Sequence, residues 1–144
     1  MTGASSTPWV AIDRRECIDL LETAAVGRLA ITVNALPTIL PVAIEMRETN
    51  VVLRFLLGSR IPVRSNQVVA LEAGNFEDAD GGPWTVVVQG MLTREQAESE
   101  SPASSGVAAP RFQLSTELVS GWRSEPIFEP SWTHARERRA AAMS

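Results

Sequence analysis

The sequence predicts a mainly β protein, a small antiparallel barrel that begins with a helix. Several segments between residues 26 and 92 alternate apolar side chains with polar or small ones, the pattern of strands with one buried face. The connections between the first three segments have the length of hairpin turns, whereas parallel strands need a much longer crossover. Five or six such strands close most simply into a barrel.

The length of the chain is that of one domain. At 144 residues it can bury a core without disulfides or metals, and a hydrophobic share of 44% is ordinary for a soluble globular protein. We expect a flexible lead-in at residues 1–11, the barrel domain at 12–135 and a tail at 136–144. Residues 98–110 are rich in Ser, Ala and Pro and lack large apolar side chains, which predicts a poorly ordered loop.

The composition excludes several kinds of site. The single Cys17 and the single His134 permit neither an internal disulfide nor a metal centre built from several histidines or cysteines. All 13 basic residues are arginine and there is no tyrosine, which excludes a Schiff-base lysine and a tyrosine acid. A net charge of −4 argues against nucleic-acid binding. Without a membrane-spanning run or a signal peptide, a cytoplasmic protein is expected.

The helix is expected to begin after Asp13. Asp13 is a good N-cap residue, and Glu16 stands at the spacing of a capping box. The apolar side chains that follow recur at helical spacing, at Cys17, Leu20, Leu21 and Ala24. This pattern places Cys17 in the core rather than in the role of a nucleophile.

Three strands joined by short turns should follow the helix. We expect them at residues 26–33, 40–46 and 51–57, with turns at 34–37 and 47–50. The third strand is apolar on both faces, so one of its faces needs a cover, and a second subunit is the simplest source.

The rest of the chain has weaker signals. A short helix is expected at 59–64, and further strands at 67–73 and 84–92. A brief helix is expected after Thr93. For the remaining chain we expect a weakly helical segment at 112–122 and an extended segment at 125–134.

One stretch combines features of an anion site. Gly58 lets the backbone approach a ligand, and the N–H groups after Ser59 favour a negative charge. Arg54, Arg60 and Arg64 would then bind a phosphate through charge-assisted hydrogen bonds. The alternative is a turn, a helix cap and solvated arginines, and spacing alone favours this alternative. Trp84 stands at the start of a strand and has two interpretations: its side chain packs in the core, or it contacts a flat ligand. Core packing is favoured.

An ordered set of short motifs matches a known family. These are Glu16-Cys17, Leu20-Leu21, Val26-Gly27-Arg28-Leu29-Ala30, Leu40-Pro41-Val42, Leu53-Arg54, Gly58-Ser59-Arg60, residues 69–72, residues 84–90 and residues 127–130. The set resembles the pyridoxamine 5′-phosphate oxidase-like proteins, the FMN-binding split-barrel flavoproteins, including the branch related to nitroimidazole-resistance proteins. The resemblance covers residues 12–94 well and the C-terminal third loosely.

The resemblance implies a six-stranded antiparallel split barrel with flanking helices. It also implies a homodimer with two flavin sites between the subunits, and residues 127–130 would begin the closing strand. The phosphate-binding residues of the family correspond to Arg54, Ser59 and Arg60, next to Gly58.

Two further sets of residues complete the site that the resemblance implies. Strands near Pro41-Val42 and Trp84-Thr85 would flank the flavin ring. Phe55 stands where the family has a threonine whose hydroxyl helps to hold the phosphate, and Arg60 replaces its usual lysine.

The leading hypothesis is therefore an FMN-dependent oxidoreductase that acts on a small-molecule substrate which the sequence does not name. The alternative is a dimeric small-ligand-binding protein on the same fold, either cofactor-free or binding the deazaflavin F420. A third hypothesis is an interaction domain whose active part is the segment 98–110.

Overall fold

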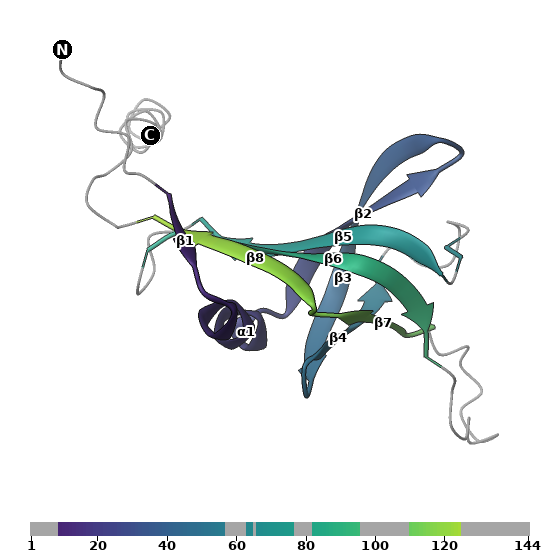
Figure 1. The fold of residues 1–144 in the computed structure, drawn as a ribbon. Helices are drawn as coiled ribbons and strands as arrows, with labels where there is room; N and C mark the ends of the chain where they lie inside the picture. The colour runs from purple at the N-terminus through teal and green to yellow at the C-terminus, as the bar shows by residue number, and fades with distance from the viewer. Residues whose placement is uncertain (1–8, 57–62, 65, 77–81, 96–109, 125–144) are drawn as a thin grey trace, which may run out of the picture.

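The computed structural model describes residues 9–56, 63–64, 66–76, 82–95 and 110–124 (Figure 1). Its elements are, in chain order, β1 (Val10–Ile12), α1 (Arg14–Thr23), β2 (Val26–Val33), β3 (Leu36–Arg47), β4 (Asn50–Phe55), β5 (Gln67–Asn75), β6 (Trp84–Arg94), β7 (Phe112–Ser115) and β8 (Leu118–Arg123).

Six of the strands close into an antiparallel barrel. Their order is β6-β5-β2-β3-β4-β7, and β7 returns to pair with β6. Strand β6 divides one edge between two short strands, because its first six residues pair with β8 and its last two with β7. Strand β1 extends the sheet beyond β8. The predicted six-stranded split barrel is therefore confirmed, and the pairings between the described strands are all antiparallel.

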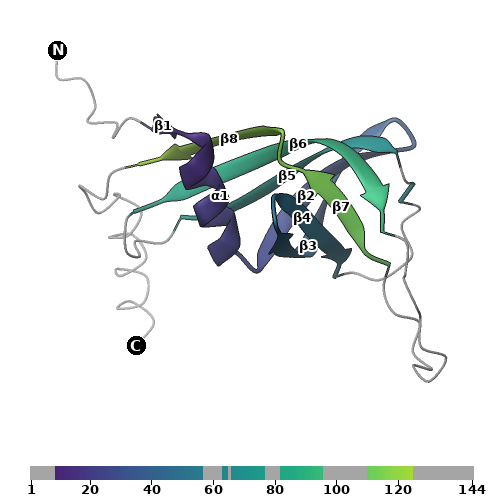
Figure 2. The same ribbon diagram turned by 60° about the horizontal axis from the view of Figure 1, so that its bottom comes forward.

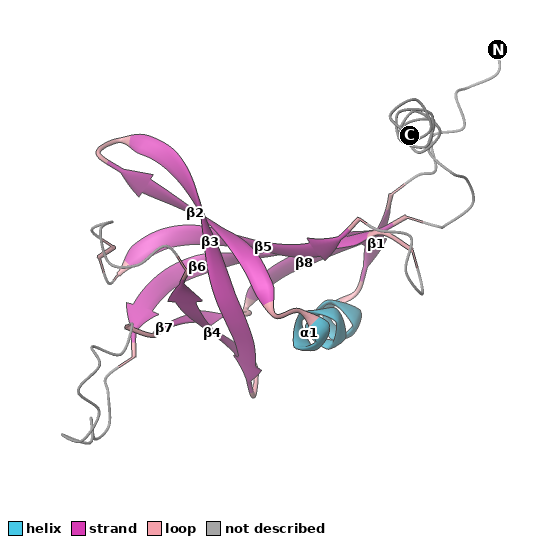
Figure 3. Ribbon diagram, turned by 180° about the vertical axis from the view of Figure 1, so that it is seen from behind, coloured by secondary structure: helices cyan, strands magenta, loops and turns pink. Residues whose placement is uncertain are grey.

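The helix forms where the capping pattern predicts it. The Asp13 carboxylate accepts a 2.8 Å hydrogen bond from the Glu16 N–H, which satisfies one of the free donors at the helix start. The helix packs under β8, β6 and β3 through Cys17 and Leu21, and it stands out in cyan in Figure 3 (also Figure 2). Burial raises the pKa of the Cys17 thiol, so the thiol stays protonated in the core, as expected.

Removing the cap should weaken the fold measurably. We expect Asp13→Ala to lower the free energy of unfolding by about 0.5–2 kcal/mol, because the Glu16 N–H loses its partner. Urea unfolding followed by circular dichroism measures this change. Asp19→Ala removes the same charge from an exposed position of the same helix and is the matched control. Equal losses from both variants would contradict the capping argument.

The middle strands follow the predicted alternation. Strand β2 spans the predicted residues, and Asn34 and Ala35 make its turn into β3 with positive φ angles of 49° and 65°. On β3, Leu40, Val42 and Ile44 point into the barrel and are buried. The core consists of these inward side chains together with those of β2, β4, β5, β6, β7 and the helix.

The C-terminal third differs from the prediction. Residues 112–122 were expected to be weakly helical but form β7 and β8, and β7 closes the barrel by pairing with β6. The reason is tertiary: β4 and β6 each present an unpaired edge, and pairing with it satisfies more backbone groups than a marginal helix would. Phe112 and Leu114 also alternate into the core.

Other expectations are wrong or lie outside the described residues. Strand β6 continues through Thr93, where a brief helix was expected, and β1 occupies the end of the expected lead-in. Val63 and Arg64 are described and are not helical, whereas the rest of the expected helix at 59–64 lies outside the described residues. Also outside the described residues are the expected loop at 98–110 except for Pro110, the expected extended chain at 125–134 with the closing strand at 127–130, and the tail at 136–144.

A threonine marks the break between β7 and β8. The Thr116 hydroxyl donates a 2.6 Å hydrogen bond to the Thr49 carbonyl oxygen and accepts one of 3.1 Å from Arg14 Nη2. Arg14 Nη1 also donates to the Thr116 carbonyl oxygen. The buried Thr116 therefore ties the helix start and the β3–β4 turn to the point where one strand leaves the barrel and the next begins.

Candidate functional site

The outward-facing side chains of β3, β2, β5, β6 and β8 form one surface, which we call the outer face. The strand register aligns Pro41 with Arg28, Arg28 with Glu72, and Glu72 with Val87. Side chains two positions along each strand point the same way, so neighbouring rows lie on the same surface. The helix covers the opposite side of the sheet (Figure 2).

Much of the outer face is apolar and open to solvent. Val68 is 73% exposed, Ile39 69%, Leu118 66% and Met91 53%. Val68 faces Met91 across β5 and β6. Side chains of this size are rarely left exposed together on a protein that acts alone, so the outer face is a candidate binding surface.

A polar cluster lies within this apolar surface. Arg28 Nη1 donates to Glu72 Oε2 over 3.2 Å, and the Thr85 hydroxyl donates to Glu72 Oε1 over 3.2 Å. Each oxygen of the Glu72 carboxylate thus has its own partner. Beside the cluster, Gly74 has no side chain, and a Cβ there would clash with the backbone of β6, 2.6 Å from the Trp84 carbonyl oxygen.

The structure brings some of the predicted site residues together on the outer face. Pro41 and Thr85 lie on it, with two strands between them. Arg54 pairs with Ala43, next to Pro41, and its exposed side chain points outward. In the part of the chain that the structure describes, no carboxylate forms an ion pair with Arg54. Its charge is therefore available to an anion.

Three other predicted site residues point into the barrel. Val42 is fully buried and Trp84 nearly so, in agreement with the core packing favoured for Trp84. The Phe55 ring meets the Phe112 ring edge-on, with centroids 5.5 Å apart. A threonine at position 55 would therefore place its hydroxyl group on the inner side of β4. Contributions of these three residues to a ligand on the outer face would come from their backbone. Gly58, Ser59 and Arg60 lie outside the described residues.

The sequence reasoning gave no role to Arg28 or Glu72. Both lie in the quoted motifs, but the pairing that joins them spans 44 residues of chain and cannot be seen in the sequence. One feature of the sequence could have drawn attention to them: each is a charged residue at an outward position of a largely apolar strand.

One face of the third strand was expected to need a second subunit as its cover, and the structure of one chain meets this expectation in part. Val51, Val52 and Leu53 are all buried within one chain, and Val52 is only 4% exposed. Val52 is therefore covered by its own subunit, whereas Leu56, which follows β4 and belongs to the predicted strand, is 53% exposed. Further exposed apolar surface occurs on the outer face.

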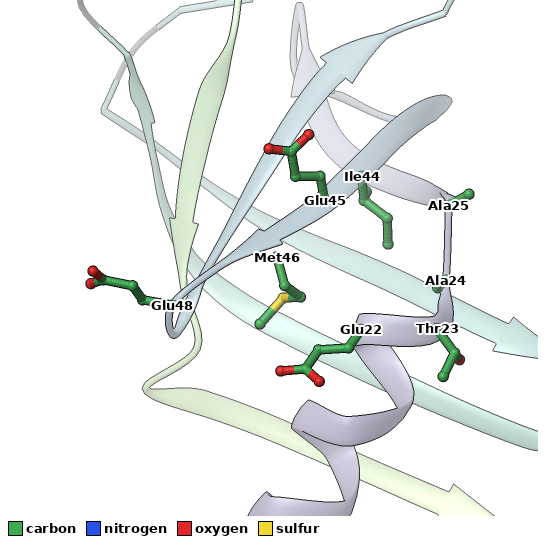
Figure 4. Close-up of a pocket in the computed structure, with 8 residues that line it drawn as sticks. All are labelled: Glu22, Thr23, Ala24, Ala25, Ile44, Glu45, Met46 and Glu48. Atoms are coloured by element: carbon green, nitrogen blue, oxygen red, sulfur yellow. The ribbon is translucent and has the colours of Figure 1, made fainter.

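A separate open cavity of about 510 Å³ lies between the end of α1 and the end of β3 (Figure 4). Ile44 and Met46 line it, and Glu22, Glu45 and Glu48 stand around it with their carboxylates well apart. No predicted site residue lines it. The cavity is therefore distinct from the predicted flavin site.

Two searches of the described residues bear on the kind of site. They contain no helix long and apolar enough to cross a membrane. They also contain no group of three or more histidine, cysteine, aspartate or glutamate side chains placed to hold a metal ion.

Solved structures of flavin proteins share this fold. A FAD-binding protein from Mycobacterium smegmatis superposes with a TM-score of 0.63 and 22% identity, over 81% of this chain and 98% of that one. A FAD-binding protein from Mesorhizobium loti gives 0.64 and 19%, over 81% and 99%. A FAD- and heme-binding protein from M. smegmatis gives 0.62 and 13%, over 88% and 79%. These likenesses support the fold.

The sequence comparisons identify the family. The search of curated proteins finds no match to this chain. The sequence model of the pyridoxamine 5′-phosphate oxidase family, by contrast, matches residues 13–120, which include the helix and every strand of the closed barrel. With its fold and its ordered motifs in agreement, the chain belongs to the pyridoxamine 5′-phosphate oxidase family.

Proposed function

We propose that this protein is a cytoplasmic, FMN-dependent oxidoreductase that binds its flavin on the outer face and acts on a small molecule. The observation that carries this proposal is the placement of Arg54. Its charge, which has no ion-pair partner among the described residues, lies beside Pro41 on an exposed face, two residues before the chain enters the segment that contains Ser59 and Arg60. Arginine donors of this kind suit a phosphate, because the planar guanidinium bonds two phosphate oxygens at once.

The residues present fit a flavin. Arg54 supplies a donor for the phosphate, and the absence of a side chain at Gly74 admits an aromatic ring close to the sheet. The similar structures named as FAD-binding proteins and the family itself support a flavin rather than an unrelated ligand. When bound, the flavin supplies the redox chemistry: its ring accepts two electrons and carries negative charge when one proton accompanies them. The protein binds and orients it.

The purified protein tests this proposal directly. We expect a flavin absorption spectrum and release of FMN on denaturation, identified by its mass. Release of FAD would show that the bound flavin is FAD rather than FMN. The assignment of the phosphate site would then change, and the assignment of a flavin cofactor would stand. A deazaflavin, or no ligand after incubation with FMN and FAD, would overturn the proposal in favour of the alternative ligand-binding protein.

We further propose that the protein is a homodimer that pairs through the outer face. The apolar side chains exposed there would be covered by the same surface of a second copy, as in an isologous interface. Such a dimer encloses two equivalent flavin sites between its subunits.

Charged substitutions on the outer face should break this dimer. We expect Val68→Arg to shift the protein to monomer at micromolar concentration, because the arginine would have to be buried without a partner. Analytical ultracentrifugation measures the change. Val10→Arg is the matched control, since Val10 is also exposed but lies on edge strand β1 and points to the other side of the sheet. A stable wild-type monomer at that concentration would contradict the proposal.

A further inference from the structure

We propose that Arg28, held in place by Glu72 and Thr85, sets the electrostatic potential at the flavin ring and thereby tunes the reduction potential of the flavin. This inference rests on the proposed function. It assigns a role to a pair of charged residues for which neither the motifs nor the comparisons give one.

The first step is the position of the pair. Pro41 on β3 and Thr85 on β6 are the two outward residues predicted to flank the ring. The strands between them are β2 and β5, and Arg28 and Glu72 occupy the outward positions of these strands in the same row as Pro41. A ring that spans the predicted flanks therefore lies over Arg28 and Glu72.

The second step is rigidity. Glu72 accepts from Arg28 with one oxygen and from Thr85 with the other, each over 3.2 Å. Because both oxygens are engaged, the carboxylate has little freedom to rotate, and it fixes the end of the long arginine side chain. An arginine with a fixed partner presents a defined charge, whereas an unrestrained one would sample many positions.

The third step is access. The Arg28 side chain is 66% exposed and that of Glu72 is 28% exposed, so the positive charge is the outer of the two. The guanidinium carries five N–H donors, and within the described residues its bond to Glu72 is made by Nη1. The other donors of Arg28 have no hydrogen bond to another described residue, so a ligand on this face can bond to them.

The fourth step is the strength of the field. Pro41 lies beside Arg28 and Val87 beside Glu72 in the same row, and covering this face with a ligand and a second subunit would exclude water. Charges interact more strongly in such a medium than in water. The Arg28 charge then stabilises the negative charge of the reduced ring, and the Glu72 charge opposes it.

The test is a pair of variants with opposite expected effects. Arg28→Gln should lower the reduction potential of the bound flavin, and Glu72→Gln should raise it. We expect each variant to change the ratio of reduced to oxidised flavin at a fixed potential by about tenfold or more, which is about 30 mV for a two-electron couple. Spectroscopic redox titration of the FMN-loaded protein against a reference dye measures both shifts.

Two controls separate this role from a structural one. Arg123→Gln removes the same charge from an ion pair with Glu16, 3.0 Å long, that lies off the outer face, and it should leave the potential unchanged. Arg28→Lys keeps the charge and should recover most of the wild-type potential. A merely structural pair would give shifts of the same direction in Arg28→Gln and Glu72→Gln, or none, and either result would overturn the inference.

The failure of this inference is distinguishable from that of the proposed function. If the wild-type protein binds no flavin, both are wrong. Suppose instead that the wild-type protein binds FMN and that the reduction potential of the flavin is the same in both variants. If the variants then change the affinity between subunits or the affinity for flavin, Arg28 and Glu72 act only in the subunit contact or in flavin binding. That result would overturn the role of Arg28 and leave the proposed function intact.

Discussion

Replacing Gly121 with alanine is expected to destabilise the protein by about 1–3 kcal/mol. Gly121 lies on β8 where the helix packs, and a Cβ there would stand 2.6 Å from Cys17 Sγ and 3.0 Å from Ile12 Cδ1. Neither neighbour is free to move, because Cys17 is buried in the core and Ile12 packs against it. The added methyl group must therefore displace the helix or β1. Chemical denaturation measures the loss.

Two further variants make this prediction specific. Gly90→Ala is the matched control, since a Cβ at Gly90 would make only ordinary contacts, 3.4 Å from Leu114 Cδ1 and 3.9 Å from the Ser115 carbonyl oxygen. It should change stability by less than about 0.5 kcal/mol. Combining Gly121→Ala with Cys17→Ala removes the closest clash, so the double variant should be more stable than the sum of the two losses predicts. Strict additivity would contradict the steric explanation.

The second large effect concerns flavin affinity. If Arg54 and Arg60 bind the flavin phosphate as proposed, Arg54→Ala and Arg60→Ala should each weaken FMN binding by roughly tenfold to a hundredfold, because each would remove a charged hydrogen-bond donor. Titration of the apoprotein by flavin fluorescence measures both. Riboflavin, which has no phosphate, should lose much less affinity in the same variants.

A control variant tests whether the effect is local. Arg15→Ala removes an exposed arginine from the helix, which lies on the side of the sheet opposite the outer face, and should leave the affinity unchanged. If Arg54→Ala behaves like Arg15→Ala, the phosphate binds elsewhere.

The sequence was sufficient for the barrel because its strongest signals are local. The cap at Asp13, the alternation on β2 and β3 and the turn at residues 34–35 each depend on neighbours within a few positions. Residues 112–122 were misjudged because their structure depends on distant edges: β7 pairs with β4, which lies about 60 residues earlier. Pattern alone carries no information about such a partner.

The candidate site was predictable in part, for the same reason. The alternation along β3 separates Pro41 from Val42, so the outward direction of Pro41 was accessible to a residue-level argument. The inward direction of Phe55 follows from its register with Val42, and the link between Arg28 and Glu72 follows from the pairing of β2 with β5. Both require the assembled sheet.

The hydrogen bond from the Glu95 N–H to the Arg111 carbonyl oxygen, 2.9 Å long, has a consequence for how this chain can change over evolution. Together with the pairing of Arg94 and Phe112, it joins the two points between which residues 96–110 are inserted. The entropy of closing a chain segment grows only with the logarithm of its length, so doubling the insert would cost about 0.6 kcal/mol. A lineage can therefore lengthen, shorten or replace this segment, and acquire a new recognition element there, while the barrel keeps its stability.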